Sequence, residues 1–463
     1  MSLSNHPRAY GSAAIALAFA AGILVTLGFK DLYPDLENRF QRKRRASSAA
    51  GSPAGSPAAH GKSGAPALLT LEDRESQSQY QPEPEPAWPL GGPRRGIQGC
   101  IGNTPLIEIP SLSVATGRTI LAKAEFLNGA GNSPKDRVAL SIIVQAEEDG
   151  LLTPHRGDTI YEGTVGSTGI SLATLARARG YRAHICMPDD QAVEKSDLLL
   201  HLGATVERVP VAPITSPDHF VNLARRRAAD HAAAAADGSR GFFANQFESR
   251  ANWRAHLETT GPEIWHQARG DVDAFVAGAG TGGTISGVAR FLKRQAEAGA
   301  VKVVLADPQG SGLYNKVKHG VMYSPTEREG TRRRQQVDSL VEGIGINRTT
   351  DNFEAGGHLI DDAVRVTDEQ ACRMARWLVD KDGIFVGSSS SVNCVAAVVA
   401  AMGLPEGSKV VTVLCDSGTR HLSKFWKRVK EMGLEEEEAS SDLFVQLGLS
   451  RDAVSMPVSG SQS

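Results

Sequence analysis

Three separated stretches of this chain carry residue types that could do chemistry together. The first is Asn132-Ser-Pro-Lys-Asp-Arg, whose lysine is Lys135; the other two, at residues 162–169 and 278–284, are rich in glycine and threonine. A lysine amine forms Schiff bases with carbonyl compounds, and glycine-rich turns let backbone N–H groups approach an anion. The three stretches therefore predict an aldehyde-bearing, phosphate-bearing cofactor on the lysine, a phosphate loop and a carboxylate loop. Those are the parts of a pyridoxal-phosphate enzyme that acts on an amino acid.

The loop at residues 278–284 follows an apolar segment and precedes a helical pattern. The N–H groups and the dipole of a helix N-terminus favour a bound phosphate, and Thr281 and Thr284 add hydroxyl donors. The loop lacks the Gly-Lys-Ser/Thr of a P-loop and does not fit the dinucleotide fingerprint. Taken alone it is equally well explained as an ordinary strand–helix turn. Its assignment depends on the two other stretches.

The elements that must position these stretches alternate between short apolar runs and longer helical patterns. This alternation predicts an α/β protein whose parallel or mixed sheets are covered by helices on both faces, with a smaller domain inserted after Lys135. We expect strands at residues 119–125, 159–162, 182–187, 205–209, 274–277, 301–306 and 409–415. We expect helices at residues 138–148, 169–178, 191–202, 219–231, 284–295, 368–381 and 391–402.

The motifs resemble those of the cysteine synthase and cystathionine β-synthase family of fold-type II pyridoxal-phosphate enzymes. The match covers residues 97–430, and the chain is most similar to a membrane-anchored fungal branch of cysteine synthases. The resemblance implies a two-domain fold like that of the tryptophan synthase β subunit, pyridoxal 5'-phosphate as cofactor, and a homodimer. The stretches that carry it are Ile101-Gly-Asn-Thr-Pro-Leu, Asn132-Ser-Pro-Lys-Asp-Arg, the Thr164 loop, Asn245-Gln-Phe-Glu-Ser-Arg-Ala-Asn, Thr260-Gly-Pro-Glu-Ile-Trp, the Gly280 loop, Val341-Glu-Gly-Ile-Gly, Val386-Gly-Ser-Ser-Ser and Cys415-Asp-Ser-Gly-Thr-Arg.

The resemblance also assigns site residues by position. It makes Lys135 the lysine of the internal aldimine and the general acid and base. Ser389, or its neighbour Ser390, would hydrogen-bond the pyridine nitrogen, and Ser167 would face the phenolic oxygen of the cofactor. The cofactor phosphate would be bound by Gly280, Thr281, Gly282, Gly283 and Thr284, and the substrate by Thr164, Val165, Gly166, Thr168 and Gln246.

The carboxylate loop departs from the family pattern, which reads Thr-Ser-Gly-Asn-Thr-Gly. Val165 replaces the serine and Ser167 replaces the asparagine, while Ser391 stands where the serine run usually ends in glycine. The shorter Ser167 hydroxyl reaches the cofactor oxygen less well than an asparagine amide, and a bridging water would be needed. These changes bear on rate and substrate choice rather than on cofactor binding.

The leading hypothesis for function is β-replacement through the Lys135 aldimine and an aminoacrylate: O-acetylserine loses acetate, and sulfide adds to give cysteine. Cystathionine β-synthase, serine or threonine dehydratase and cysteine desulfhydrase activities are enzymatic alternatives. A membrane-tethered pseudoenzyme that binds the cofactor as a scaffold is an alternative of another class, motivated by Val165 and Ser167. The sequence leaves open the substrate's leaving group, the sulfur donor and the physiological direction.

Residues 9–29 carry no charge and are mostly apolar, a length of 21 residues that suffices for a membrane-spanning helix. Arg8 precedes them, whereas six lysines and arginines follow between residues 30 and 45. This asymmetry predicts a translocated tail at residues 1–8 and a catalytic domain in the cytosol. We expect a single-pass anchor of the mitochondrial outer membrane, with the endoplasmic reticulum as the other possible membrane. A cleaved signal peptide or a matrix presequence fits less well.

The remaining segments complete the predicted organisation. Residues 30–96 are basic and then rich in Ala, Ser, Gly and Pro, which predicts a disordered linker. The catalytic domain should span residues 97–432, with the smaller subdomain at about 136–255. Residues 318–340, with three consecutive arginines, read as a solvated loop, and residues 433–463 as an acidic, Ser-rich and mostly disordered tail.

Composition excludes some classes of partner and site. The net charge of −2 gives no argument for nucleic-acid binding. The five cysteines include no Cys-x-x-Cys pair, so the sequence suggests neither a metal site nor a disulfide framework. The partners that we expect are a small amino acid, sulfide and, through residues 9–29, a lipid bilayer.

Overall fold

The computed structural model describes residues 93–235, 237–295, 300–322, 339–436 and 440–451, which belong to one compact unit, Leu90–Ser463. The predicted membrane anchor at residues 9–29, nearly all of the predicted linker and most of the predicted loop at 318–340 lie outside these residues. In the ranges that are described, we find no helix with the length and apolarity to cross a membrane.

The larger sheet is mixed and has six strands in the order β1-β2-β10-β7-β8-β9. Its β1 runs antiparallel to β2, and every other neighbouring pair is parallel. The strands come from both ends of the described chain, so the two ends build one sheet. They are β1 (Leu106–Glu108), β2 (Thr119–Ala124), β7 (Ala274–Gly278), β8 (Lys302–Pro308), β9 (Asp362–Val366) and β10 (Lys409–Leu414).

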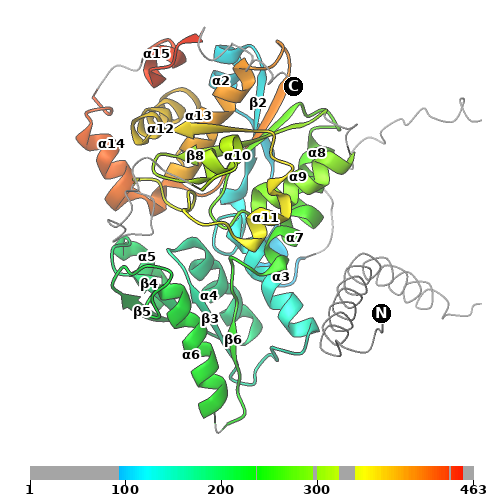
Figure 1. The fold of residues 1–463 in the computed structure, drawn as a ribbon, viewed down its shortest axis with the longest axis vertical. Coiled ribbons are helices and arrows are strands. Elements are labelled where there is room, and N and C mark those ends of the chain that lie inside the picture. Colours follow the sequence, from blue (N-terminus) through cyan, green and yellow to red (C-terminus); the bar gives the residue numbers. More distant parts are fainter. Residues whose placement is uncertain (1–92, 236, 296–299, 323–338, 437–439, 452–463) are drawn as a thin grey trace, which may run out of the picture. The chain divides into compact units, whose positions relative to one another are not determined.

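The smaller sheet is wholly parallel and has the order β5-β4-β3-β6. Figure 1 shows its strands gathered with α4, α5 and α6 in one half of the molecule. The mixed and parallel sheets confirm the predicted α/β architecture. The elements of this half are β3 (Thr159–Gly163), β4 (Arg182–Pro188), β5 (Thr205–Val209), β6 (Gly241–Phe243), α4 (Ser167–Arg179), α5 (Val193–His201) and α6 (Phe220–Ala234).

The other helices cover the larger sheet or connect the two halves. The α-helices are α2 (Pro110–Thr116), α3 (Lys135–Glu148), α7 (Arg250–Ala255), α8 (Gly261–Gln267), α9 (Gly283–Gln295), α10 (Leu313–His319), α11 (Asp351–Gly357), α12 (Asp368–Asp382), α13 (Ser388–Met402), α14 (Lys427–Glu431) and α15 (Leu443–Leu447). Short 3₁₀ segments lie at Ile97–Cys100, Glu125–Leu127 and Gly418–Arg420, and π-helical turns at His256–Thr260 and Leu422–Trp426.

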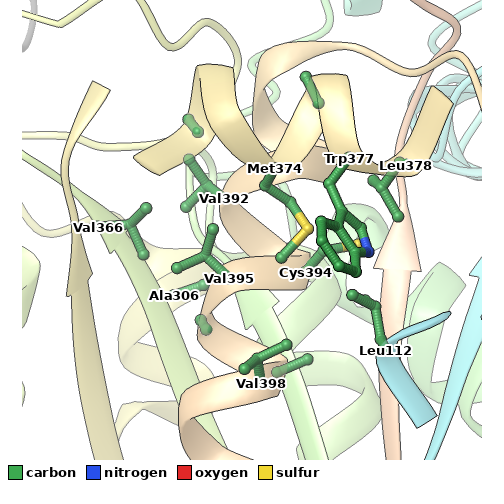
Figure 2. Packing of buried hydrophobic residues seen from close by; sticks show 14 of the residues in the cluster. Leu112, Ala306, Val366, Met374, Trp377, Leu378, Val392, Cys394, Val395 and Val398 are labelled. Carbon is green, nitrogen blue, oxygen red and sulfur yellow. The ribbon is translucent and has the colours of Figure 1, made fainter. Parts of the chain in front are cut away.

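The core beside the larger sheet is built around α13, which is buried along almost its whole length. A helix that is apolar on all sides has to be enclosed, and α13 lies between the sheet and α12. Figure 2 shows Met374 and Trp377 of α12 beside Val392 and Cys394 of α13. This packing fixes the serine run at the start of α13.

The segment after residue 432 differs in part from the predicted disordered tail. Leu443, Phe444 and Leu447 of α15 are buried in the same core cluster as α12. The carboxylate of Asp442 accepts a hydrogen bond from the Phe444 N–H at 2.8 Å and so caps the helix. Composition did not predict this short apolar run, because the residues around it are acidic and rich in serine.

Candidate active site

One cavity with a volume of about 240 Å³ brings the three stretches together. Its wall includes Lys135, part of the loop after β3 and part of the loop after β7. These loops follow the carboxyl ends of parallel strands in two different sheets. That edge is where open α/β sheets bind ligands.

Lys135 is the first residue of α3 rather than part of a preceding loop. Its side chain is half-buried and lines the cavity. Burial lowers the pKa of the Lys135 amine below its ordinary value, although Cys415 and Asp416 oppose that shift. An uncharged lysine amine is the nucleophilic form that a Schiff base requires.

A buried ion-pair network holds the first turn of α3 in place. The Arg137 guanidinium forms two hydrogen bonds of 2.8 Å with Glu125 and contacts Glu263 at 2.6 and 2.8 Å. Lys123 reaches the same Glu263 at 2.6 Å, and the Thr104 hydroxyl donates to Glu125 at 2.7 Å. Bidentate pairing of this kind fixes orientation as well as charge. Arg137 therefore anchors the backbone two residues after Lys135.

The loop between β7 and α9 is shaped so that an anion can approach its backbone. A Cβ atom on Gly280 would overlap the carbonyl oxygen of Gly343. Gly282 has a φ of +85° and a Cβ there would lie 2.6 Å from the Cα of Phe353. Both positions therefore require glycine. The start of α9 at Gly283 places a helix N-terminus directly behind the loop.

Polar side chains from other elements support this loop. Asn252 Nδ2 donates to Thr281 Oγ1 at 2.9 Å, and Thr350 Oγ1 donates to the Thr281 carbonyl oxygen at 2.7 Å. His256 Nε2 lies 3.2 Å from Thr284 Oγ1. Burial lowers the pKa of His256 to about 3, so the ring is neutral at physiological pH. The threonine side chains are thus oriented before any ligand binds.

The loop after β3 is tied to Gln246. Thr168 Oγ1 donates a hydrogen bond to Gln246 Oε1, and Gln246 Nε2 donates to the Gly163 carbonyl oxygen at 3.0 Å. Gln246 Nε2 also lies 3.3 Å from Glu162, whose pKa burial raises to about 8. The orientation of the Gln246 amide is therefore set by partners from the start of α4 and from β3.

Two neighbouring serines at the start of α13 differ in what they face. Ser389 lines the cavity. Ser390 is fully buried, and its Oγ accepts a hydrogen bond from the Cys415 N–H at 2.8 Å. The sequence did not decide between these two serines. The structure favours Ser389 as the serine available to a ligand.

Most residues predicted from sequence share the cavity wall, and two do not. Gly166 precedes α4 and has a φ of 149°, while Gly283 packs against Asn252, so both shape the loops from behind. The residues in the wall are Lys135, Thr164, Val165, Ser167, Thr168, Gln246, Gly280, Thr281, Gly282, Thr284 and Ser389.

Sequence reasoning missed a charged group in the same wall, formed by Lys195, Glu342, Asp416, His421 and Lys424. Glu342 and Asp416 lie inside two matching stretches, which is a signal that could have drawn attention to them. Lys195 had no such signal, because a lysine on a helix usually faces solvent.

The residues present fit pyridoxal phosphate. The glycine cradle with its threonine hydroxyls and helix N-terminus suits a phosphate, and Lys135 supplies an amine for the aldehyde. Ser389 offers a hydroxyl within the same cavity. The structure thus provides a separate group for each end of the cofactor.

Comparisons with known proteins agree with this geometry. The family model described as "Pyridoxal-phosphate dependent enzyme" matches residues 97–416. "Cysteine synthase 2" of Neurospora crassa is 67% identical over 97% of this chain and 99% of its own length. "Putative mitochondrial cysteine synthase" of Saccharomyces cerevisiae is 56% identical over 73% of this chain and 86% of its own length. The crystal structure of O-ureido-L-serine synthase superposes with a TM-score of 0.61 at 31% identity, covering 76% of this chain and 99% of that one.

Proposed function

Because the chain belongs to the pyridoxal-phosphate dependent enzyme family, we propose that it is a cysteine synthase, which forms cysteine and acetate from O-acetylserine and sulfide. The observation that carries this proposal is the shared cavity, in which Lys135 meets both anion-binding loops and Gln246. A phosphate loop and a carboxylate loop on one cavity match a cofactor and an amino-acid substrate that react with each other.

Bound pyridoxal phosphate supplies an electron sink for the charge that develops when the α-proton of the substrate leaves. Lys135 would hold the cofactor, and its amine would accept the α-proton of the substrate. Residues 280–284 hold the phosphate. The Ser389 hydroxyl would be a neutral hydrogen-bond partner for the pyridine nitrogen.

Thr164, Thr168 and Gln246 hold the substrate carboxylate. The hydrogen bonds of Gln246 to Thr168 and Gly163 orient its amide beforehand, so little side-chain entropy is lost on binding. Val165 gives the wall an apolar side chain beside this carboxylate site and packs against the small cluster around Phe220. Ser167 lies in the wall as well, where its hydroxyl can serve the cofactor through a water.

The test follows the two halves of the reaction in the purified full-length protein. We expect a visible absorbance band of the bound cofactor that changes when O-acetylserine is added without sulfide, together with acetate release. Sulfide should then restore the band and yield cysteine. An absorbance band that does not change when O-acetylserine is added would refute the proposal. Serine plus homocysteine is the matched substrate pair, and a higher turnover with that pair would assign the cystathionine β-synthase activity instead.

The scaffold alternative makes a different prediction. Replacing Lys135 by Ala in cells should abolish cysteine formation and leave protein abundance unchanged if the chain is an enzyme. A null phenotype in the deletion strain together with a normal phenotype for Lys135→Ala would favour the scaffold.

The proposal extends to the location and division of the chain. An anchor at residues 9–29 would hold a catalytic domain at residues 97–432 on the cytosolic face of the mitochondrial outer membrane, tethered by residues 30–96. The apolar segment with basic residues after it supports this location, as does the mitochondrial name of the Saccharomyces relative. Alkaline carbonate extraction and protease treatment of intact mitochondria test it. Release by carbonate, or protection from protease, would refute the anchored cytosolic arrangement.

The same proposal includes a subdomain at about residues 136–255, an acidic tail after residue 432 and a homodimer. Light scattering of the purified protein coupled to gel filtration measures its mass. A monomeric mass at micromolar concentration would contradict the dimer.

A further inference from the structure

The charged group in the cavity wall lies outside the residues that hold the cofactor and the substrate carboxylate. Lys195, Glu342, Asp416 and His421 each expose at most 8% of their side chains, and all four line the cavity. Burying charged groups costs several kcal/mol for each ion unless other groups compensate. This group therefore has to be explained either by stability or by chemistry at the cavity surface.

His421 and Asp416 form a dyad with one ring nitrogen left over. His421 Nε2 lies 3.0 Å from Asp416 Oδ2. Among the described residues, His421 Nδ1 is buried and has no hydrogen-bond partner. A carboxylate accepts and cannot donate, so in the neutral imidazole the proton lies on Nε2 and Nδ1 keeps its lone pair. The pKa of Asp416 lies below its ordinary value because His421 and Arg420 outweigh the effect of burial.

The backbone makes room for this dyad. A Cβ atom on Gly387 would overlap both Asp416 Oδ1 and His421 Nε2. Gly387 has an ordinary φ of −80°, so its lack of a side chain matters for space rather than for conformation. Glycine at this position therefore allows the dyad to pack directly against the start of α13, next to Ser389.

Glu342 is a weaker candidate for taking up a proton. It forms an ion pair with Lys195, and its other oxygen lies 3.5 Å from the Lys424 ammonium. Although burial opposes ionisation, Lys195 and His421 lower the pKa of Glu342. Its oxygens are thus already engaged with cations.

Charged groups surround the dyad. The charged groups facing this region are Asp416, Glu342, Lys135, Lys195, Arg420 and Lys424. If the ring gains a proton, Glu342 Oε2 lies 3.5 Å from Nδ1 and can stabilise it.

We propose that His421 Nδ1 accepts the proton of the sulfur nucleophile, with Asp416 as the residue that positions the ring. This inference rests on the proposed function. The S–H bond breaks, the proton moves to Nδ1, and the sulfur electron pair forms the new C–S bond at the β-carbon. The Lys135 amine returns its proton to the α-carbon, which completes the amino acid. The bond from that carbon to the acetyl oxygen has broken, its electron pair has left with acetate, and the proton on the ring later passes to solvent. A carboxylate that orients a histidine base is a recurrent arrangement for activating a nucleophile.

The two half-reactions test this role in the full-length holoenzyme. For His421→Ala we expect acetate release from O-acetylserine without sulfide to stay within about twofold of wild type. We expect cysteine formation to fall by about 100-fold, the lower end of the usual contribution of a general base. Free imidazole should raise the rate of cysteine formation by the variant at least about tenfold, because it can occupy the space left by the ring. His155→Asn is the matched control: His155 is exposed and has a φ of 62°, which asparagine tolerates.

The outcomes separate this proposal from the proposed function. Wild type that releases no acetate refutes the proposed function, and the role of His421 fails with it. Wild-type turnover in His421→Ala, or equal losses in both half-reactions without imidazole rescue, refutes the role of His421 alone. Cofactor loading and Tm of each variant are measured first, and His421→Gln replaces His421→Ala if the latter does not fold.

The pH profile of Asp416→Asn distinguishes a residue that positions the His421 ring from one with a purely structural role. A neutral amide stabilises a protonated ring less than a carboxylate does. The low-pH limb of the rate of cysteine formation should therefore move to lower pH in Asp416→Asn. An unchanged pH profile would remove Asp416 from the proposal.

Discussion

The network around Arg137 gives a prediction that can be worked out from the structure. Arg137→Ala removes the guanidinium that forms hydrogen-bonded ion pairs with Glu125 and Glu263. Glu125 is fully buried, and among the described residues its carboxylate would keep the Thr104 hydroxyl and the Asn128 amide as its hydrogen-bond partners. Removing one partner of a buried pair costs about 3–5 kcal/mol, because the other charge is left uncompensated.

The pKa of Glu125 leads to a similar value for the free energy of unfolding that is lost. Burial opposes ionisation, but the Arg137 charge and its hydrogen bonds lower the pKa of Glu125 from 4.5 to about 2. Each pKa unit is worth about 1.4 kcal/mol, so the ionised carboxylate contributes about 3 kcal/mol to the free energy of unfolding at neutral pH. A lowered pKa stabilises the folded state above the unfolded value of 4.5, and this contribution is lost as pH falls towards 2.

Urea denaturation of wild type and Arg137→Ala at pH 7 and pH 4 measures both effects. We expect the variant to lose about 3–5 kcal/mol at pH 7 and less at pH 4. Arg451→Ala is the control, since Arg451 pairs with Asp442 at 3.1 Å and these side chains are 54% and 40% exposed. That change should cost less than about 1 kcal/mol. Equal losses in the two variants, or a loss at Arg137 that does not depend on pH, would refute the reasoning.

Three further changes test the cofactor site. After borohydride reduction, mass spectrometry of Lys135→Ala should find no cofactor attached to the chain. Cofactor attached to this variant would show that another residue holds it. Gly282→Ala has to move backbone, because its Cβ would lie 2.6 Å from the Cα of Phe353; we expect retention of the cofactor during gel filtration to fall at least about tenfold, as for a distortion costing about 1–3 kcal/mol. Thr350→Ala removes both the cap of α11 at Phe353 and the hydrogen bond to the Thr281 carbonyl oxygen; Tm should fall by an amount equivalent to about 1–2 kcal/mol, and an unchanged Tm would contradict the capping argument.

Much of the fold could be predicted from sequence because its signals are local. Alternating apolar runs and helical patterns located the central strands and long helices to within a few residues, as for β4 (Arg182–Pro188) and α12 (Asp368–Asp382). The short elements were missed. The three residues of β1 and the five of α15 are too few to show a periodicity, and they are stabilised by packing rather than by propensity.

The candidate site was predictable to the extent that its chemistry lies in continuous motifs. Glycines with threonines and a lysine in a distinctive hexapeptide indicate anion loops and a Schiff base wherever they lie in the fold. The sequence did not decide whether Ser389 or Ser390 meets the ligand, because neighbouring residues of a helix point in different directions. The rotation of α13 is fixed by its packing between the sheet and α12.

By itself, the sequence determined the order of strands and helices, the two glycine-rich loops, the lysine and the family to which they correspond. The tertiary structure decided which distant side chains share one cavity, and that Glu342 and His421 belong to it. It also decided the protonation of buried groups, because a pKa depends on solvent exclusion and on charges that lie near in space rather than in sequence. Lys195 illustrates the difference: its position on α5 predicts a solvated charge, whereas the fold buries it against Glu342, 147 residues further along the chain.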